Sequence, residues 1–278
     1  MRKKIIVTGA TSGIGKATVE ALANEDNHLI LGCRNLPKTE KIVDDLKAMN
    51  NDVKIDIYVL DLASFESIKD FAKTINTSYD AIDILVNNAG VFSDKKAYTK
   101  EGFELTVGVN YIGTYYLTTL LLPLISKGHN PQIINICSRA ALFGKFTLKE
   151  NAFVKQSHGF RGYSASKYLQ LTSTIYMAET LNNNIKMNAV HPGDAATGIW
   201  KGDSLLMKLV GPIMKKALSS SEDAAKAGLY LIENTPDKSG LLYEKEGVVI
   251  EHTKYDKSFA ESLIRETDQL IDKSSKSK

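Results

Sequence analysis

Cysteine is scarce in this chain, because its 278 residues contain only Cys33 and Cys137. Each cysteine lies in an apolar run typical of a strand, so we expect two buried, unreactive thiols and no disulfide. That usage is consistent with a reducing compartment, and we expect a cytoplasmic protein.

Long hydrophobic runs are also missing. The most apolar stretch, "YYLTTLLLPLI" at 115–125, is too short to span a bilayer and contains Pro123. The N-terminal "MRKKIIVTG" offers only three apolar residues in a row, too few for the core of a signal peptide. We therefore expect neither a membrane anchor nor a membrane partner.

The chain has no large excess of either charge. Its 35 Lys and Arg residues nearly balance 32 Asp and Glu residues, a net charge of +3, so nucleic acid is not an expected partner. His129 and His158 are isolated and show no metal-ligand spacing, so no metal is expected. No linker rich in Pro, Gly or Ser divides the sequence, which predicts one domain over 1–272 and a flexible tail at 273–278.

What is present is a regular alternation of short β-branched runs with amphipathic segments of helix length. Strands are predicted at 3–9, 28–34, 53–62, 82–90, 132–138 and 185–193, with a last short strand within 247–252. Helices are predicted at about 14–24, 38–49, 64–76, 101–125, 162–182, 221–233 and 256–272. This pattern indicates an α/β domain, a single Rossmann-type doubly wound parallel sheet flanked by helices on both faces.

Two segments break the alternation, and long irregular segments in compact domains are often functional loops. Residues 139–161 form an insertion that contains four phenylalanines, which could line a substrate site or simply pack the loop onto the domain. Residues 194–218 carry an apolar stripe at helical spacing, usually a sign of core packing, but here interpreted as a lid over the substrate.

A glycine-rich turn follows the first predicted strand in "IIVTGATSGIGKATVEAL". Gly9 allows a tight turn, Gly13 lets the backbone approach a pyrophosphate, and Gly15 lets the helix pack close to the sheet. The free N–H groups at the helix start favour a bound phosphate. The spacing G-x-x-x-G-x-G differs from the usual dinucleotide fingerprint, so the prediction of nucleotide binding depends on the turn lying in the first βα unit.

The end of the second predicted strand indicates which dinucleotide binds. An acidic residue about twenty positions beyond the glycines would hold a ribose 2′-hydroxyl, but this neighbourhood has Arg34 and no acid until Glu40. A guanidinium suits a 2′-phosphate in charge and geometry. The alternative is an ordinary surface arginine; we predict NADP(H) in preference to NAD(H).

"GYSASKYLQ" at 162–170 places Tyr163 and Lys167 four residues apart, hence on one face of a helix. By itself this spacing is also typical of an exposed helix turn. With "TGATSGIG", "DLAS", "LVNNAG", "VNYIGTYYL", "INICS" and "HPG" in this order, however, the chain resembles the short-chain dehydrogenase/reductase family from end to end.

The resemblance implies a catalytic group. Tyr163 would donate or accept the proton with Lys167 as its partner, and Ser138 would bind the substrate oxygen. Asn110 would hold a water linked to Lys167. Taken alone, Asn110 could instead cap or kink its helix and Ser138 could be a simple strand-end hydroxyl; His191, before Pro192, is interpreted as structural.

The resemblance also implies the residues around the cofactor, from the glycine-rich turn to the strand ends that face the adenine, the ribose and the nicotinamide. They are Gly9, Thr11, Ser12, Gly13, Ile14, Gly15, Arg34, Asn35, Asp61, Leu62, Asn88, Ala89, Gly90, Tyr163, Lys167, Pro192, Gly193 and Thr197.

The expected reaction interconverts a ketone or aldehyde and an alcohol by hydride transfer. A phenol has an ordinary pKa near 10, so we expect the ammonium of Lys167, together with the positive ring of the oxidised cofactor, to lower the pKa of Tyr163 toward the working pH. The substrate is expected to be a small-molecule carbonyl or alcohol compound of apolar character, and the resemblance implies a homodimer or homotetramer paired through the helices at 101–125 and 162–182.

One departure narrows the resemblance. Ser138 and Tyr163 are 25 residues apart, whereas many members place about a dozen residues between them. A long gap, together with "CRN" at a strand end, is similar to the retinol-dehydrogenase-like, NADP-dependent branch, here without a membrane anchor. Two alternatives stay open: a non-catalytic NADP-sensing or scaffold protein, and a nucleotide-sugar epimerase or dehydratase.

Overall fold

One twisted sheet organises the part of the chain that the computed structural model describes, residues 2–181, 184–193, 220–250 and 255–276. In those residues eight strands pair in the order β3-β2-β1-β4-β5-β6-β7-β8, and every pairing is parallel except that of β7 with β8. The strands are β1 (Lys3–Thr8), β2 (Asn27–Cys33), β3 (Lys54–Val59), β4 (Ile84–Asn87), β5 (Gln132–Ile136), β6 (Lys186–Val190), β7 (Leu242–Glu244) and β8 (Val248–Ile250).

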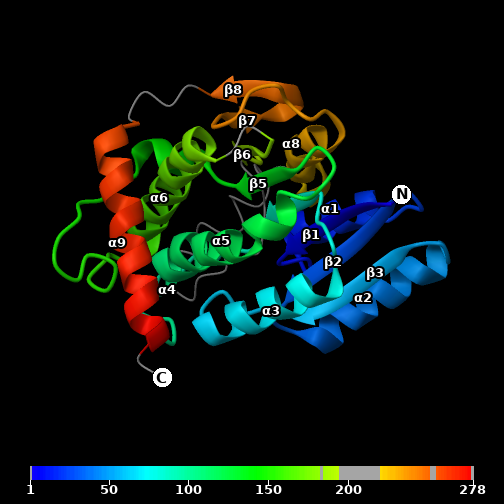
Figure 1. Ribbon diagram of the computed structural model, residues 1–278, viewed down its shortest axis with the longest axis horizontal. Coiled ribbons are helices and arrows are strands. Elements are labelled where there is room, and N and C mark those ends of the chain that lie inside the picture. The colour runs from blue at the N-terminus through cyan, green and yellow to red at the C-terminus, as the bar shows by residue number, and fades with distance from the viewer. Residues whose placement is uncertain (1, 182–183, 194–219, 251–254, 277–278) are drawn as a thin grey trace.

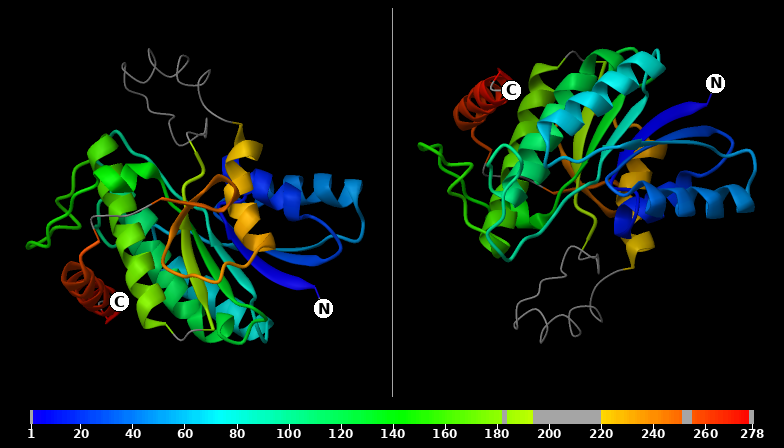
Figure 2. Two further views of the ribbon diagram at one scale, coloured as in Figure 1. Left: turned by 90° about the horizontal axis from the view of Figure 1, so that it is seen from above. Right: turned by 90° about the horizontal axis from the view of Figure 1, so that it is seen from below.

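Helices cover both faces of the sheet, as Figures 1 and 2 show. The longer ones are α1 (Gly13–Leu22), α2 (Leu36–Met49), α3 (Phe65–Ser78), α5 (Thr114–Ile125), α6 (Gly159–Thr180), α8 (Ser221–Glu233) and α9 (Lys257–Lys276). Short helical turns complete the described chain: α4 (Leu105–Val107), the π-helix η1 (Gly108–Gly113), and the 3₁₀ turns η2 (Arg139–Phe143) and η4 (Lys245–Gly247).

Alternation along the strands creates two hydrophobic cores. Ile5 and Val7 of β1 point to the face covered by α1, α2 and α8, whereas Ile6 points to the face covered by α3, α5, α6 and α9. All three side chains are fully buried. A strand buried on both faces has a continuous run of apolar residues, and this run is what predicted the strand from the sequence.

The α/β class and doubly wound sheet predicted from the sequence are therefore confirmed, with two local differences. β7 lies in a segment where no strand is predicted, because only three residues extend the sheet there. β8 falls in the predicted range but runs antiparallel, since a short turn, η4, joins it directly to β7.

The helix predicted at 101–125 begins late and is irregular. Gly102 has a φ of +85°, and the side chain of Glu104 accepts a hydrogen bond from the Val107 N–H, so α4 begins only at Leu105. The helix then widens into η1 before α5 continues it. At the other end of the chain, α9 continues to Lys276, four residues beyond the helix predicted from the sequence.

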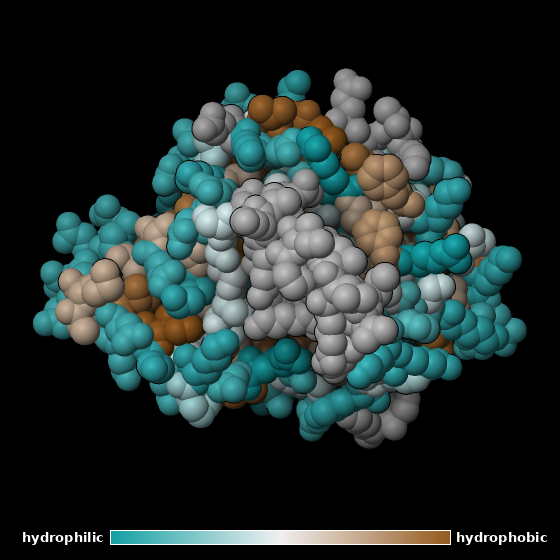
Figure 3. Space-filling view, turned by 180° about the vertical axis from the view of Figure 1, so that it is seen from behind, coloured by the Kyte–Doolittle hydropathy of each residue, from teal (hydrophilic) through white to brown (hydrophobic). Residues whose placement is uncertain are grey.

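Both cysteines are free and buried, as predicted. Among the described residues, no helix combines the length and apolar character needed to cross a bilayer. Seen from behind, the described surface is largely hydrophilic, and apolar side chains gather along the edge where β8 lies (Figures 1 and 3). Two of them belong to β8, because Val248 and Val249 are both exposed.

Candidate active site

The glycine-rich turn has the backbone conformation that its sequence predicts. Gly9 and Gly13 have φ values of +71° and +55°, which side-chain-bearing residues rarely adopt. A Cβ atom at Gly15 would collide with the Gly9 carbonyl and the Asn88 amide, so only glycine fits where α1 crosses the turn. Ser12 precedes α1 and its hydroxyl makes no capping hydrogen bond, which leaves the helix start accessible to an anion.

Asn88 connects this turn to the next strand of the sheet. Its side-chain nitrogen donates to the carbonyls of Thr8, at 2.8 Å, and Gly9, at 3.2 Å. Ala89 packs so closely that a Cβ atom at Gly9 would lie 2.9 Å from its Cα. Asn88 and Ala89 therefore hold the turn in place.

The other predicted cofactor residues differ in what their side chains do. Arg34 is exposed at the end of β2 and makes no ion pair within the described structure. The Asn35 side chain caps α2 through the Lys38 N–H, at 3.0 Å, and Asp61 accepts from the Ala63 N–H. Leu62 is buried in the core. Ile14 is likewise a core residue and Thr11 is half-buried in the turn.

Asn110 lies in η1 and joins two parts of the candidate site. Its side chain accepts from the Val91 N–H at 2.8 Å and donates to the Val91 carbonyl and to Ser166 Oγ of α6. A π-turn in a long helix is frequently found at a functional site. A Cβ atom added to Gly90 would point at Asn110 Oδ1 and Lys167 Nζ, 3.3 and 3.9 Å away, so the missing side chain leaves space beside the catalytic candidates.

Tyr163 and Lys167 lie on α6 as predicted, both almost fully buried. The Lys167 ammonium is 6.0 Å from the centre of the Tyr163 ring. It donates to the Ile136 carbonyl at 2.7 Å and to Gln170 Oε1 at 2.8 Å. Burial lowers the pKa of Lys167 to about 8.

Ser138 lies two residues after the end of β5 and caps η2, because its Oγ accepts a hydrogen bond from the Ala140 N–H. Burial raises the pKa of Tyr163, and a hydrogen bond with the Ser138 side chain only partly opposes the increase. Among the protein's own groups, burial therefore opposes ionisation of the phenol, and the acidified phenol expected beside Lys167 and the oxidised cofactor stays a prediction. The desolvation free energy of the phenolate is larger than the stabilisation that its neighbouring groups provide.

A second network of polar contacts involves Arg139, the residue after Ser138. His191 is buried, and its Nδ1 faces the Arg139 N–H at 3.3 Å. The Arg139 guanidinium donates to Glu244 of β7 at 2.6 Å, and the same carboxylate lies 3.9 Å from His191 Nε2. These contacts agree with the structural role expected for His191. Pro192 and Gly193, which has a φ of +78°, follow it at the end of β6, and Thr197 lies outside the described residues, as does the predicted lid at 194–218.

The phenylalanines of the insertion at 139–161 divide into two pairs. Phe153 is buried between Phe146 and Tyr111, with ring centroids 5.0 and 6.2 Å away. Phe143 and Phe160 are instead 71% and 55% exposed. They lie at the two ends of the insertion that adjoin Ser138 and Tyr163.

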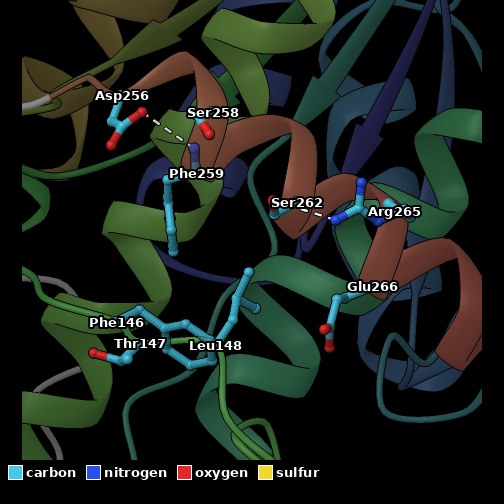
Figure 4. Close-up of a pocket in the computed structure, with 9 residues that line it drawn as sticks. All are labelled: Phe146, Thr147, Leu148, Asp256, Ser258, Phe259, Ser262, Arg265 and Glu266. Carbon is cyan, nitrogen blue, oxygen red and sulfur yellow. Dashed lines mark hydrogen bonds between the residues drawn. The ribbon is translucent and has the colours of Figure 1, made fainter.

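A cavity of about 500 Å³ separates the insertion from α9. Phe259 of α9 points across it toward Phe146 and Leu148 (Figure 4). None of the predicted catalytic or cofactor residues lines this cavity, so it is distinct from the candidate active site. No cluster suited to a metal ion occurs among the described residues.

Sequence reasoning missed three residues that contact the predicted ones: Ser166, Gln170 and Glu244. Gln170 follows Lys167 by three positions, a helical spacing that would have revealed it. Ser166 is a small residue between Tyr163 and Lys167, and no pattern marks it as the partner of Asn110. Glu244 lies more than 50 residues from Arg139 and His191, so no local pattern points to it.

Comparisons with known proteins agree with this arrangement. The family described as short chain dehydrogenase matches residues 3–205. Human retinol dehydrogenase 13 is 33% identical over 251 residues, which cover 87% of this chain and 76% of that protein. Mouse retinol dehydrogenase 14 is 27% identical over 277 residues, covering 95% of this chain and 83% of that protein.

Solved structures share the fold at lower identity. A protein from Mycobacterium paratuberculosis of uncharacterised function has a TM-score of 0.75 at 23% identity, covering 97% of this chain and 93% of its own. A short chain dehydrogenase from Escherichia coli CFT073, in complex with NADPH, has a TM-score of 0.70 at 21% identity, covering 87% of this chain and 95% of its own.

Proposed function

Because the chain belongs to the short-chain dehydrogenase family and is an oxidoreductase of that family, we propose that it uses NADP(H) to interconvert a ketone or aldehyde and an alcohol. The observation that carries the proposal is the meeting of Tyr163, Lys167 and Ser138 at the ends of β5 and α6, beside Gly90. An oxygen bound there would contact a proton donor and a hydroxyl at once.

The residues present fit a dinucleotide. The turn at Gly9 and Gly13 offers backbone N–H groups and a helix start to the phosphates, and the space at Gly90 faces the catalytic candidates. Pro192 and Gly193 would adjoin the nicotinamide, which when bound supplies or accepts the hydride and, in its oxidised form, a positive charge. Arg34, exposed and without a carboxylate partner among the described residues, supports a 2′-phosphate.

Each catalytic candidate would then have a distinct task. Ser138 would orient the substrate oxygen, and Tyr163 would give it a proton or take one from it. Lys167 would favour the phenolate through its charge, and it would also reach the nicotinamide ribose. Asn110 would hold α6 against the loop after β4 and so keep Lys167 aligned with Tyr163.

The substrate class is proposed from two exposed residues of the insertion. Phe143 follows Ser138 by five positions and Phe160 precedes Tyr163 by three, and both present apolar rings to solvent, which supports an apolar carbonyl compound. The similarity to proteins named retinol dehydrogenases supports the same class without identifying the compound.

The test is NADPH oxidation measured against a panel of apolar aldehydes and ketones, with Tyr163→Phe as the comparison. We expect turnover by the wild type and a loss of about 10²–10⁴-fold in the variant, because the phenol is the group proposed to transfer the proton to or from the substrate oxygen. NADPH affinity should change little. Full activity of Tyr163→Phe would contradict the mechanism, and NADPH binding without turnover on any compound would favour a sensor.

A further inference from the structure

The contact between Gln170 and Lys167 is not explained by the hydride-transfer chemistry. Gln170 is only 2% exposed, and its Oε1 lies 2.8 Å from Lys167 Nζ. Its Nε2 is buried and makes no hydrogen bond within the described structure. A buried amide that satisfies one end and leaves the other unpaired is costly, so a benefit elsewhere is expected.

The orientation of this amide follows from charge. Lys167 has only donors, so the amide oxygen must face the ammonium, and the amide nitrogen must point away. The backbone that carries this side chain is fixed in α6, because the Gln170 backbone carbonyl accepts hydrogen bonds from the hydroxyls of Ser173 and Thr174. The side chain therefore extends from an anchored turn of α6 toward Nζ.

The acceptors around Lys167 are neutral. Nζ contacts the Ile136 carbonyl and Gln170 Oε1, and no carboxylate pairs with it in the described part of the chain. Neutral dipoles stabilise a buried ammonium without cancelling its charge, whereas a carboxylate would cancel the field that reaches Tyr163. The ammonium also keeps a third N–H for the Tyr163 side of the pocket.

We propose that Gln170 is a positioning residue for Lys167, whose side-chain oxygen keeps the buried ammonium charged and directed beside Tyr163 at neutral pH. Its effect on catalysis rests on the proposed function, but its effect on Lys167 does not.

The first experiment measures Lys167 directly, without substrate or cofactor. The wild type and Gln170→Leu are labelled with ¹³Cε-lysine and titrated by NMR, with the Lys167 signal assigned from Lys167→Met. The wild-type midpoint should lie near pH 8, and Gln170→Leu should lower it by about one unit or more, because one of two acceptors is lost. Gln170→Met serves as a second apolar variant if Gln170→Leu does not fold.

A matched control comes from β5. Gln132 is another buried glutamine, and its Nε2 donates to Thr235 at 2.9 Å, with no contact to Lys167. Gln132→Leu should leave the Lys167 midpoint unchanged. A midpoint that is equal in the wild type and in folded Gln170→Leu overturns the proposal.

The second experiment follows the pH dependence of kcat/KM for alcohol oxidation. Gln170→Leu should move the acidic limb to higher pH, since less charge reaches Tyr163. Gln170→Glu should raise the Lys167 midpoint yet also move the limb to higher pH, because the added carboxylate cancels the ammonium charge. If the acidic limb of the kcat/KM profile stays at the same pH in both variants, the proposed effect of Gln170 on catalysis is overturned. An inactive wild type would instead contradict the proposed function, while the NMR titration still decides whether Gln170 acts on Lys167.

Discussion

Lys167 and Tyr163 share a buried pocket in which burial favours the neutral form of each. Because the folded-state pKa of Lys167 is lowered from 10.5 to about 8, the unfolded chain binds more protons between those values. The free energy of unfolding therefore increases as the pH rises from about 8 to 10.5. Below pH 8 the destabilisation caused by burying this ammonium is present in full. A group whose burial lowers the stability of the protein at neutral pH is a candidate for a functional residue.

The cofactor preference is also decided at single residues. Arg34→Asp should weaken NADPH binding by about 10–100-fold, since a charge-assisted contact is replaced by repulsion from the 2′-phosphate. NADH binding should change much less. Titration of both cofactors by fluorescence measures the two affinities, with Lys38→Asp, a substitution at an exposed lysine of α2, as the charge-matched control. Equal losses for NADPH and NADH would contradict the assignment.

At the scale of elements, the insertion between β5 and α6 has two kinds of aromatic residue. Phe153 packs against Tyr111 of η1, and Phe146 packs against Phe153, so this part of the insertion fastens the loop to the domain. Phe143 and Phe160 do not share that core. Packing of the loop therefore applies to Phe153 and Phe146, whereas an apolar wall at the substrate site stays a prediction for Phe143 and Phe160.

The two pairs should respond differently to truncation. Phe153→Ala should lower the free energy of unfolding by about 3–5 kcal/mol, because it leaves a cavity beside Tyr111. Phe143→Ala should change stability by about 0.5 kcal/mol or less, but should raise KM for apolar substrates. Urea unfolding and steady-state kinetics measure these effects, and an unchanged KM for Phe143→Ala would argue against its contact with substrate.

At the scale of the whole molecule, α9 returns the C-terminal part of the chain to the helices at the centre. Thr267 and Tyr111 meet through their hydroxyls at 2.7 Å, and the Tyr115 hydroxyl donates to Asp268 at 2.8 Å. Leu263 and Thr267 are fully buried. α9 therefore covers part of η1, α5 and α6, the helices expected to pair subunits, and a partner helix would have to displace α9 to reach these residues.

Docking of α9 predicts a measurable share of the stability. Leu263→Ala should lower the free energy of unfolding by about 2–5 kcal/mol, as expected for a buried leucine truncated within a packed interface. Ser262→Ala, one residue earlier and partly exposed, is the control and should have little effect. Urea unfolding gives both values; equal stability of the two variants would show that α9 contributes little to the core.

The sequence by itself determined the α/β class, the glycine-rich turn and the Tyr163–Lys167 spacing. These are local properties. The apolar run of a strand buried on both faces, the positive φ of a glycine and the periodicity of a helix each depend on residues that are close together in the sequence. For the same reason Gln170 was within reach of sequence reasoning, three positions from Lys167. The family motifs additionally predicted the other candidate site residues and their order along the chain.

Only the tertiary structure decided what depends on contacts between distant segments. It placed Glu244 of β7 against Arg139 and His191, and it covered Tyr111 with α9. It also buried the Tyr163 phenol, which raises its pKa, since desolvation is set by everything packed around the phenol rather than by the lysine four residues away. Burial and long-range pairing are sums over the folded chain, and no local pattern contains them.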